Sequence, residues 1–177
     1  MEHLPTGIVD SSTTQGPPED APVTDRLLAF LRANEADFHV LTHAPVRTSR
    51  EAARARGTPL EQGAKALVFQ ADERTVLLVV QAHRRVDTRA FKRAVGVKNL
   101  RMVSADDLKA LTGLEVGAVP PFGHLLGLPT YVDARLLELP RIAFNAGSRS
   151  TSVVMATQDF ARLARPLVGR FAADEEQ

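Results

Sequence analysis

Two short stretches of the sequence hold the residues best suited to chemistry. Residues 117–123 read GAVPPFG, an apolar run that contains two prolines and two glycines. Proline restricts a backbone and glycine permits turns and close approach, so this run is either a shaped binding loop or a rigid surface turn packed against the core. Residues 64–70 read AKALVFQ, which places Lys65 on one strand face with Leu67 and Phe69.

Lys65 has two interpretations. In partly apolar surroundings a lysine has a lowered pKa and desolvated donors, which suit it to holding a phosphate, carboxylate or ester oxygen. Near the first residue of a strand, the same side chain can instead extend into water. The residue pattern alone favours the second interpretation.

Other familiar signatures are absent from the sequence. It contains no GxGxxG, GxxxxGK(S/T), HExxH or GxSxG segment, and it has no cysteine, which excludes thiolate metal sites, disulfides and a cysteine nucleophile. His39 and His43 lie in a run that alternates like a strand, with no carboxylate beside it, so we expect no metal site. We also expect no acyl nucleophile among four hydroxyl residues that have no recognisable general base beside them: Ser148, Ser150, Thr151 and Ser152.

The composition indicates one globular domain. The chain has 177 residues, of which 44% are hydrophobic and 24% are charged, and no apolar stretch approaches the roughly 20 residues that span a bilayer. Residues 1–10 have neither the basic start nor the apolar centre of a signal peptide. We therefore expect a cytoplasmic protein with no membrane partner.

Charge is distributed unevenly along the chain. The net charge is only +1, but all 22 Lys and Arg residues lie between two acidic ends. The densest basic stretch, residues 83–101, suits a polyanionic partner or forms an ordinary solvated face. No helix-turn-helix signature accompanies it, so we expect no specific DNA binding.

Periodicity and capping residues predict an α+β domain over residues 24–170. Polar, acidic composition predicts a flexible N-terminal tail over 1–23 and a C-terminal tail over 171–177. Helices are expected where a capping residue precedes an amphipathic run, at 24–34, 49–57, 87–96, 104–113 and 157–167. Strands are expected at 38–43, 64–70, 75–81, 100–103, 129–133, 141–147 and 151–156, with the second and third joined as a hairpin. This order lacks a strict βαβ rhythm and favours a mixed, mainly antiparallel curved sheet flanked by helices.

The same segments, in the same order, resemble the YbaK/ProX family of aminoacyl-tRNA deacylases. The matching runs are THAPVRTSREAA, GAKALVF, LTGLEVGAVPPFG, PTYVDARLLEL and FNAGSRSTSVVM, followed by a closing helix. They extend from about His43 to Leu167. The most specific element is the Gly-x-x-x-Pro loop, Gly117 to Pro121, together with the upstream Lys65.

The resemblance implies an editing hydrolase that removes the amino acid from a mischarged tRNA without a metal or cofactor. In such a protein the loop positions the ester through its backbone, Lys65 contacts the adenosine end or the aminoacyl group, and water attacks. The implied catalytic residues are Lys65, Gly117 and Pro121. The implied substrate-binding residues are Ala118, Val119, Pro120, Phe122, Gly123, Asp133, Gly147 and Ser148. For Asp133 a turn or cap role is an equal alternative.

The resemblance also implies a nucleic-acid partner. The acceptor end of the tRNA is expected on the basic stretch, with a synthetase as a transient partner. The residues expected to contact the tRNA are Arg84, Arg85, Arg89, Lys92 and Arg93.

Departures from the family pattern leave the edited amino acid open. Members that clear alanine from proline tRNA carry Asn directly after the lysine, whereas this chain has Ala66. The segment FNAGSRS is closer to the YbaK-like form. Cys, Ala, Ser and Thr all remain candidates, because synthetases discriminate poorly among such small groups. Because folds are reused, a non-catalytic module that binds tRNA or a small ligand is the alternative function.

Overall fold

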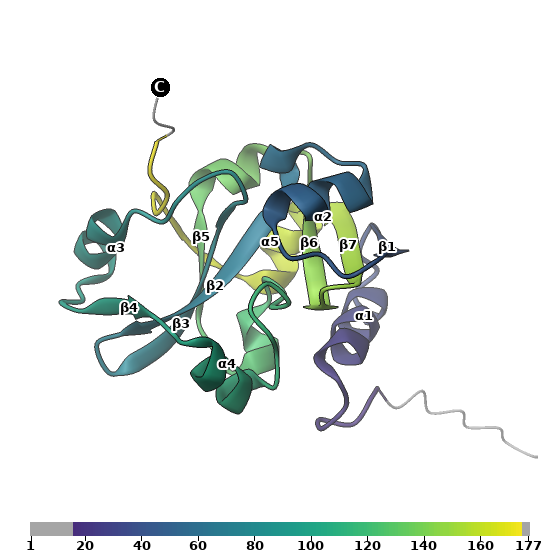
Figure 1. The fold of residues 1–177 in the computed structure, drawn as a ribbon, viewed down its shortest axis with the longest axis horizontal. Coiled ribbons are helices and arrows are strands. Elements are labelled where there is room, and N and C mark those ends of the chain that lie inside the picture. Colours follow the sequence, from purple (N-terminus) through teal and green to yellow (C-terminus); the bar gives the residue numbers. More distant parts are fainter. Residues whose placement is uncertain (1–15, 175–177) are drawn as a thin grey trace, which may run out of the picture.

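A computed structural model describes residues 16–174, so most of the expected tail over 1–23 and the last residues of the tail over 171–177 lie outside the described residues. The chain forms a mixed α+β fold, which confirms the predicted fold class (Figure 1). The helices are α1 (Val23–Ala33), α2 (Ser49–Arg56), α3 (Thr88–Val95), α4 (Ala105–Thr112) and α5 (Thr157–Ala164). The strands are β1 (Phe38–Thr42), β2 (Ala64–Ala71), β3 (Arg74–Gln81), β4 (Leu100–Met102), β5 (Thr130–Asp133), β6 (Arg141–Ser148), β7 (Thr151–Ala156) and β8 (Leu167–Gly169).

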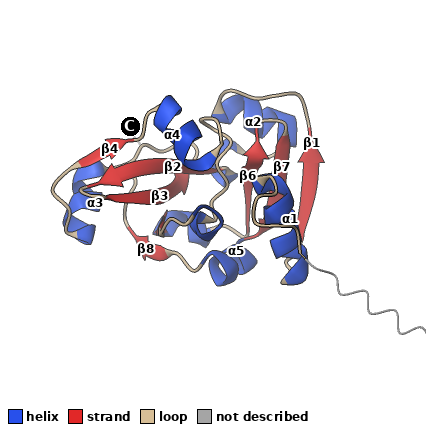
Figure 2. Ribbon diagram, turned by 90° about the horizontal axis from the view of Figure 1, so that it is seen from below, coloured by secondary structure: helices blue, strands red, loops and turns tan. Residues whose placement is uncertain are grey.

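The strands are divided between two sheets, which Figure 2 shows side by side. The smaller sheet has the order β1-β7-β6 with antiparallel pairs. The larger has the order β4-β2-β3-β5-β8, in which β2 and β3 form the predicted hairpin and β5 and β8 add in parallel. A parallel bridge between Gly63 and Ala143 joins the start of β2 to β6. The two sheets therefore meet at the residues that lead into Lys65.

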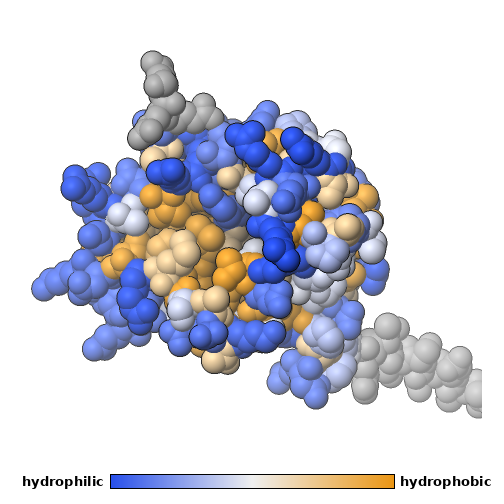
Figure 3. Space-filling model, viewed as in Figure 1, coloured by the Kyte–Doolittle hydropathy of each residue, from blue (hydrophilic) through white to orange (hydrophobic). Residues whose placement is uncertain are grey.

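Two hydrophobic clusters cover opposite faces of the larger sheet. Alternate residues of β2 and β3 point to opposite faces, so Val68 and Val79 belong to the first cluster while Phe69 and Val80 belong to the second. The first cluster also takes in α1, α5 and the smaller sheet, and the second takes in α3. On the face shown in Figure 3, hydrophobic side chains gather over the larger sheet and hydrophilic ones surround them. The central hairpin is thus buried on both sides and gives Lys65 a rigid support.

Local signals predicted the N-caps of α3 and α4 and the glycines that end α2, α3 and α4. The side chain of Asp87 accepts a hydrogen bond from the backbone of Ala90 at the start of α3, and Ser104 caps α4 in the same way.

The other three predicted caps are wrong. Thr48 rather than Ser49 accepts the bond from Glu51 N at the start of α2. Thr24 and Thr157 lie inside α1 and α5, which begin after Pro22 and Ala156 without a side-chain cap.

The last helix is shorter than the sequence predicted. It ends at Ala164, because Arg165 has a φ of 48° and Pro166 cannot continue the helical hydrogen bonds. Leu167, expected on the helix, instead begins β8.

The packed part of the chain also extends beyond the predicted boundary at residue 170. Phe171 is 3% exposed and Ala172 is 7% exposed, and both belong to the second hydrophobic cluster. The ring of Phe171 packs edge-on against Phe91 with ring centroids 5.2 Å apart. The acidic composition of 171–177 misled the prediction, because its first two residues are apolar and pack as core.

Candidate functional site

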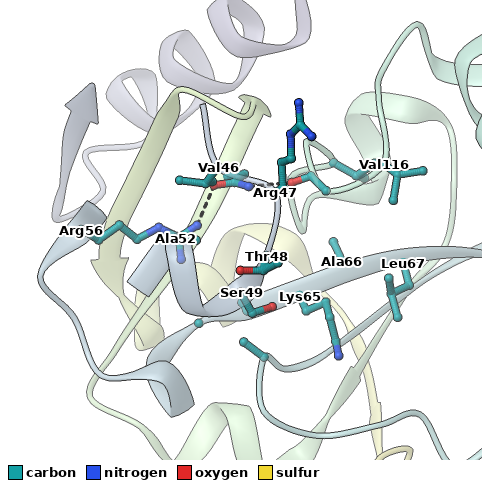
Figure 4. A pocket seen from close by; sticks show the side chains of 16 residues that line it. Val46, Arg47, Thr48, Ser49, Ala52, Arg56, Lys65, Ala66, Leu67 and Val116 are labelled. Atoms are coloured by element: carbon teal, nitrogen blue, oxygen red, sulfur yellow. Dashed lines mark hydrogen bonds between the residues drawn. The ribbon is translucent and has the colours of Figure 1, made fainter. Parts of the chain in front are cut away.

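A cavity of about 200 Å³ lies where the two sheets meet. Its walls come from α2 and the turn before it, the start of β2, the loop over residues 116–119 and β6 (Figure 4). Small apolar side chains such as Ala52, Ala66 and Val119 contribute much of the lining. The charged residues in this lining are Arg47, Arg56 and Lys65, and the lining includes no Asp, Glu or His. The cavity therefore suits a small group attached to a polyanion.

Lys65 lies in the pocket lining, on β2, and is half-buried. Its ammonium donates a hydrogen bond to the backbone carbonyl of Arg84, with an N···O distance of 2.8 Å. Burial lowers the pKa of Lys65, and the nearby positive charge of Arg85 lowers it further. The location in a pocket contradicts the view that this side chain simply extends into water.

The Gly-x-x-x-Pro loop lies partly in the pocket and partly in the core. Gly117 and Val119 line the pocket. Pro120, Pro121 and Phe122 are buried, and the ring of Phe122 packs edge-on against Phe160 with centroids 5.4 Å apart. The loop is therefore a firmly held wall of the pocket and not a surface turn.

Two glycines explain the special composition of this loop. Gly117 has a φ of +87°, a conformation that L side chains rarely adopt. At Gly123 a Cβ atom would lie 2.4 Å from the carbonyl oxygen of Leu128, so no larger residue fits. The backbone of Gly123 donates to the hydroxyl of Thr130 at 2.9 Å, which ties the end of the loop to β5.

Arg56 is a pocket residue that the sequence analysis missed. Its guanidinium donates to the hydroxyl of Ser152 at 2.9 Å and to Oδ1 of Asn145 at 2.7 Å. Burial lowers its pKa to about 10. Figure 4 shows Arg56 approaching from α2, apart from Lys65 on β2. Its partners are 89 and 96 residues away in sequence, so no local pattern could have found them.

Asn145 connects Arg56 to the loop. Its amide nitrogen donates to the carbonyl of Gly117 at 2.7 Å. Like Arg56, Asn145 lines the pocket and was not among the predicted site residues. The signal that could have drawn attention to it was the polar Asn inside the apolar strand RIAFNAG.

One serine does have a histidine beside it, contrary to the sequence analysis. Nε2 of His43 lies 2.8 Å from the hydroxyl of Ser152, and Nδ1 of His43 lies 2.8 Å from the carbonyl of Ala44. A carbonyl only accepts, so Nδ1 donates to Ala44. The hydroxyl of Ser152 also lies 3.3 Å from Oδ1 of Asn145. Ser152 is fully buried, is bound by Arg56 and is not part of the pocket lining, so this pair supports the fold of the site without presenting a nucleophile.

Asp133 has a structural position rather than one in the pocket. It is 0% exposed, and its carboxylate accepts hydrogen bonds from the backbone of Phe171 and Ala172, each at 2.8 Å, and from Arg135. Burial raises its pKa, but the hydrogen bonds from Arg135, Phe171 and Ala172 lower it more, so the net pKa lies below the ordinary value. The cap role left open by the sequence is the one that the geometry supports.

Several other predicted substrate-binding residues border the pocket without lining it. The backbone of Gly147 donates to the carbonyl of Ala118 at 2.8 Å, and the hydroxyl of Ser148 pairs with that of Ser150 at 2.9 Å. Ala118, like the two loop prolines, is buried. The bond between Gly147 and Ala118 supports the loop from outside the pocket lining, whereas the contact of Ser148 with Ser150 does not involve the pocket.

The five residues predicted to contact tRNA fall into two groups. Arg84 and Arg85 lie beside Lys65, as the hydrogen bond and the charge effect show. Arg89, Lys92 and Arg93 lie on α3, which Figures 1 and 2 both place far from α2 along the long axis of the molecule. The side chain of Arg84 is already engaged with Gln81 and with the carbonyl of Ala173, whereas Arg85 is exposed.

Neither a metal cluster nor a membrane helix stands out in residues 16–174. Within that range no three or more His, Asp or Glu side chains gather closely enough to hold a metal ion. No helix there combines the length and hydropathy needed to cross a membrane.

The chain is similar to known editing proteins. The family model for the aminoacyl-tRNA editing domain matches residues 43–163, which include every pocket residue named above. The chain is 36% identical to the multifunctional Ser/Thr-tRNA deacylase ProXp-y of Escherichia coli K12 over 151 residues, covering 82% of this chain and 90% of that protein. It is 28% identical over 101 residues to a proline–tRNA ligase of Caldicellulosiruptor bescii, covering 57% of this chain and 17% of the ligase.

A solved structure supports the same assignment. The crystal structure of a putative trans-editing enzyme for prolyl tRNA synthetase superposes with a TM-score of 0.76 and 28% identity, over 87% of this chain and 99% of that one. With a family match over more than half of its length and this agreement in fold, the chain belongs to the aminoacyl-tRNA editing domain family.

Proposed function

We propose that this chain is a free-standing editing hydrolase that cleaves the ester bond of a tRNA carrying the wrong, small amino acid. The observation that carries the proposal is the small pocket that brings Lys65 together with Gly117 and Val119 inside the matched family region. The match over 90% of the E. coli deacylase, against 17% of a synthetase, supports an enzyme that acts on tRNA in trans.

The size and polarity of the pocket support serine or threonine as the edited group. A cavity of about 200 Å³ admits a small side chain, and the hydroxyl groups of Thr48 and Ser49 add polar groups to its apolar lining. A hydroxylated aminoacyl group fits this mixture better than alanine does, because a site that hydrogen-bonds a hydroxyl discriminates against a group that lacks one. The E. coli relative is named a Ser/Thr-tRNA deacylase, which agrees with this choice.

The proposed reaction is the addition of water to the ester carbonyl. The carbon–oxygen bond to the ribose then breaks, the released ribose oxygen takes a proton, and the products are the free amino acid and uncharged tRNA. The pocket lining has no carboxylate or imidazole to act as a general base, so the rate gain comes from orientation, with the neighbouring ribose hydroxyl assisting the water. Lys65 would hold the adenosine end or the aminoacyl group.

The acceptor end would enter beside Lys65 and α2. Arg85 is exposed next to Lys65, and α2 adds Arg50 and Arg54 as exposed side chains near the pocket. These cations would contact phosphates with little base reading. The similarity to proline–tRNA ligases supports a synthetase as the transient partner that releases the tRNA.

The test is a deacylation assay with a panel of charged tRNAs. Purified protein is incubated with labelled Ser, Thr, Ala and Cys esters of tRNA, including proline tRNA, and release of the amino acid is measured. We expect selective release of Ser or Thr, and Lys65→Ala should lower kcat/KM at least about tenfold, because a positioned charged donor contributes on the order of 1.5–3 kcal/mol.

Lys109→Ala is the matched control, because Lys109 is an exposed lysine on α4 outside the pocket lining. It should keep full activity. Thermal unfolding of both variants separates a lost contact from a lost fold. Failure of the wild-type protein to release any amino acid would contradict the proposed function, and full activity of Lys65→Ala would contradict the role of the lysine.

A further inference from the structure

We propose that Asn145, held in place by Arg56, is a positioning residue that orients the Gly117 peptide for catalysis. The inference rests on the proposed function of the pocket. It assigns Asn145 no direct contact with the substrate, because its amide groups are both engaged: Nδ2 donates to the carbonyl of Gly117 and Oδ1 accepts from Arg56.

The end of β6 and the turn that follows it hold three consecutive carbonyl groups of the loop. Arg149 donates to the carbonyl of Val116 at 2.8 and 3.0 Å, and Asn145 donates to that of Gly117 at 2.7 Å. The backbone of Gly147 donates to the carbonyl of Ala118 at 2.8 Å. Residues 145, 147 and 149 thus each bind one carbonyl group of the loop, so the three peptide groups are held together.

This arrangement directs backbone donors away from the β6–β7 turn. In a planar trans peptide the N–H points opposite to the carbonyl, so fixing the carbonyls of Val116 and Ala118 also fixes the N–H groups of Gly117 and Val119. Both residues line the pocket, and among the hydrogen bonds of residues 16–174 neither N–H has a protein partner. They are the donors that an ester carbonyl would use as it gains negative charge.

The peptide group that joins Gly117 to Ala118 lies between these two N–H groups, and both its carbonyl and its N–H are hydrogen-bonded. Its carbonyl is bound by Asn145, and the N–H of Ala118 donates to the carbonyl of Glu115 at 3.0 Å. If the bond to Asn145 is lost, this peptide can rotate, and both neighbouring N–H groups move with it. An error of about 1 Å in such a site can cost on the order of 100-fold in rate.

Arg56 sets which way the Asn145 amide faces. An asparagine side chain can present oxygen or nitrogen to a neighbour, and a guanidinium only donates, so Arg56 selects the oxygen and leaves the nitrogen for Gly117. The second bond of Arg56, to Ser152, and the bond of Ser152 to His43 fix the guanidinium itself. All three acceptors along this path are uncharged, so its purpose is orientation and not charge neutralisation.

The main test is Asn145→Asp. The introduced carboxylate keeps the acceptor for Arg56 but cannot donate to Gly117, and it repels that carbonyl. We expect kcat for deacylation to fall about 10- to 100-fold while KM for the charged tRNA changes less than about threefold. The melting temperature should remain within a few degrees, because the bond to Arg56 becomes an ion pair.

Asn34→Asp is the matched control. Nδ2 of Asn34 donates to the carbonyl of Phe30 at 2.8 Å, the same kind of bond at the end of α1. This variant should keep the kcat of the wild type. An unchanged kcat in Asn145→Asp, or an equal loss in both variants, would overturn the proposal.

Amide exchange gives a second test that needs no activity. The N–H groups of Ala118 and Gly147 are hydrogen-bonded within the clamped loop, so hydrogen exchange followed by NMR should show faster exchange at both in Asn145→Asp and no change in Asn34→Asp. If the wild type proves inactive but exchange rises as expected, the proposed function fails while the clamp stands. Unchanged exchange would overturn the clamp even in an active enzyme.

Arg56 variants test whether Arg56 orients the side-chain amide of Asn145. Arg56→Lys retains one donor and loses the fork that bridges Asn145 and Ser152, so its kcat should lie between those of the wild type and Arg56→Met. Combining Arg56→Met with Asn145→Ala should cost little more than the larger single loss, since both act on one peptide. Additive losses in kcat would show that Arg56 acts independently of Asn145.

Discussion

Lys65 and Arg56 are two partly buried cations of the pocket, and each is held by uncharged acceptors. Lys65 donates to a backbone carbonyl, and Arg56 donates to a hydroxyl and an amide oxygen. Burial lowers the pKa of both, because the charged form loses hydration. No carboxylate lines the pocket beside them, so their positive charge remains available to an anionic partner.

We expect Arg85 to contact a phosphate of the tRNA. It is exposed and close enough to lower the pKa of Lys65, whereas the side chain of Arg84 already has protein partners. Arg85→Ala should raise KM for charged tRNA and reduce the slope of log KM against log salt by about one, as expected for one lost phosphate contact. Steady-state kinetics at several salt concentrations would measure both.

Arg32→Ala is the control, because Arg32 is exposed in the last turn of α1. It should change neither KM nor the salt slope. An unaltered KM in Arg85→Ala at every salt concentration would remove Arg85 from the tRNA surface.

Among the helices and strands, the sequence was sufficient to predict those limits that depend on neighbouring residues in the chain. Ser104 and Gly113 bound α4 as their types predict, and the β2–β3 hairpin follows from two β runs and a short turn. Leu167 has helical spacing from Phe160 and Leu163, yet it lies on β8 because Arg165 and Pro166 break the helix first.

The pocket was harder to predict than the elements that build it. The sequence identified Lys65 and the loop, since each has an unusual residue type in its local context. Arg56 looks like any other arginine of an Arg-rich helix, and only the approach of α2 to β6 and β7 gives it partners. The choice between a pocket role and a cap role for Asp133 stayed open for the same reason, because two of the groups that it binds are 38 and 39 residues further on.

Gly117→Ala tests the loop as an element. A Cβ atom at a φ of +87° strains the backbone, so stability should fall by about 1–2 kcal/mol and kcat should drop as the peptide moves. Gly113→Ala is a matched control, because Gly113 has a φ of +74° with open space around it and ends α4 outside the pocket lining. Denaturant unfolding should show similar losses of stability in both variants. Deacylation rates should show a loss of kcat only in Gly117→Ala. Equal kcat values would mean that the loop conformation is not needed.

At the scale of the whole molecule, the C-terminal segment completes the second hydrophobic cluster. β8 pairs with β5, and Phe171 and Ala172 pack behind the larger sheet. Asp133 at the end of β5 binds the backbone of both residues and the side chain of Arg135. One buried carboxylate therefore joins the segment to the domain.

Asp133→Asn should destabilise the protein by about 2–3 kcal/mol, because the bonds from Arg135 and two backbone N–H groups lose their charged acceptor. The lowered pKa of Asp133 also fixes the sign of a pH effect. Its stabilisation is complete above the unfolded pKa of about 4 and is lost as pH falls through the lower folded value. Melting temperatures between pH 7 and pH 3 should fall in acid, and the difference between wild type and variant should shrink. A constant difference across this range would contradict the assignment.

Because the loop would act through its main chain, systematic replacement of its residues by alanine would give a misleading map of this protein. Position 118 is already alanine, and truncating Val119 leaves its N–H in place. Such a survey would therefore show little effect at loop residues whose backbone N–H groups take part in the reaction. Backbone substitution, such as an amide-to-ester exchange at residue 117 or 119, would be the informative perturbation, and an inhibitor directed at these two amides would be difficult to escape by point mutation.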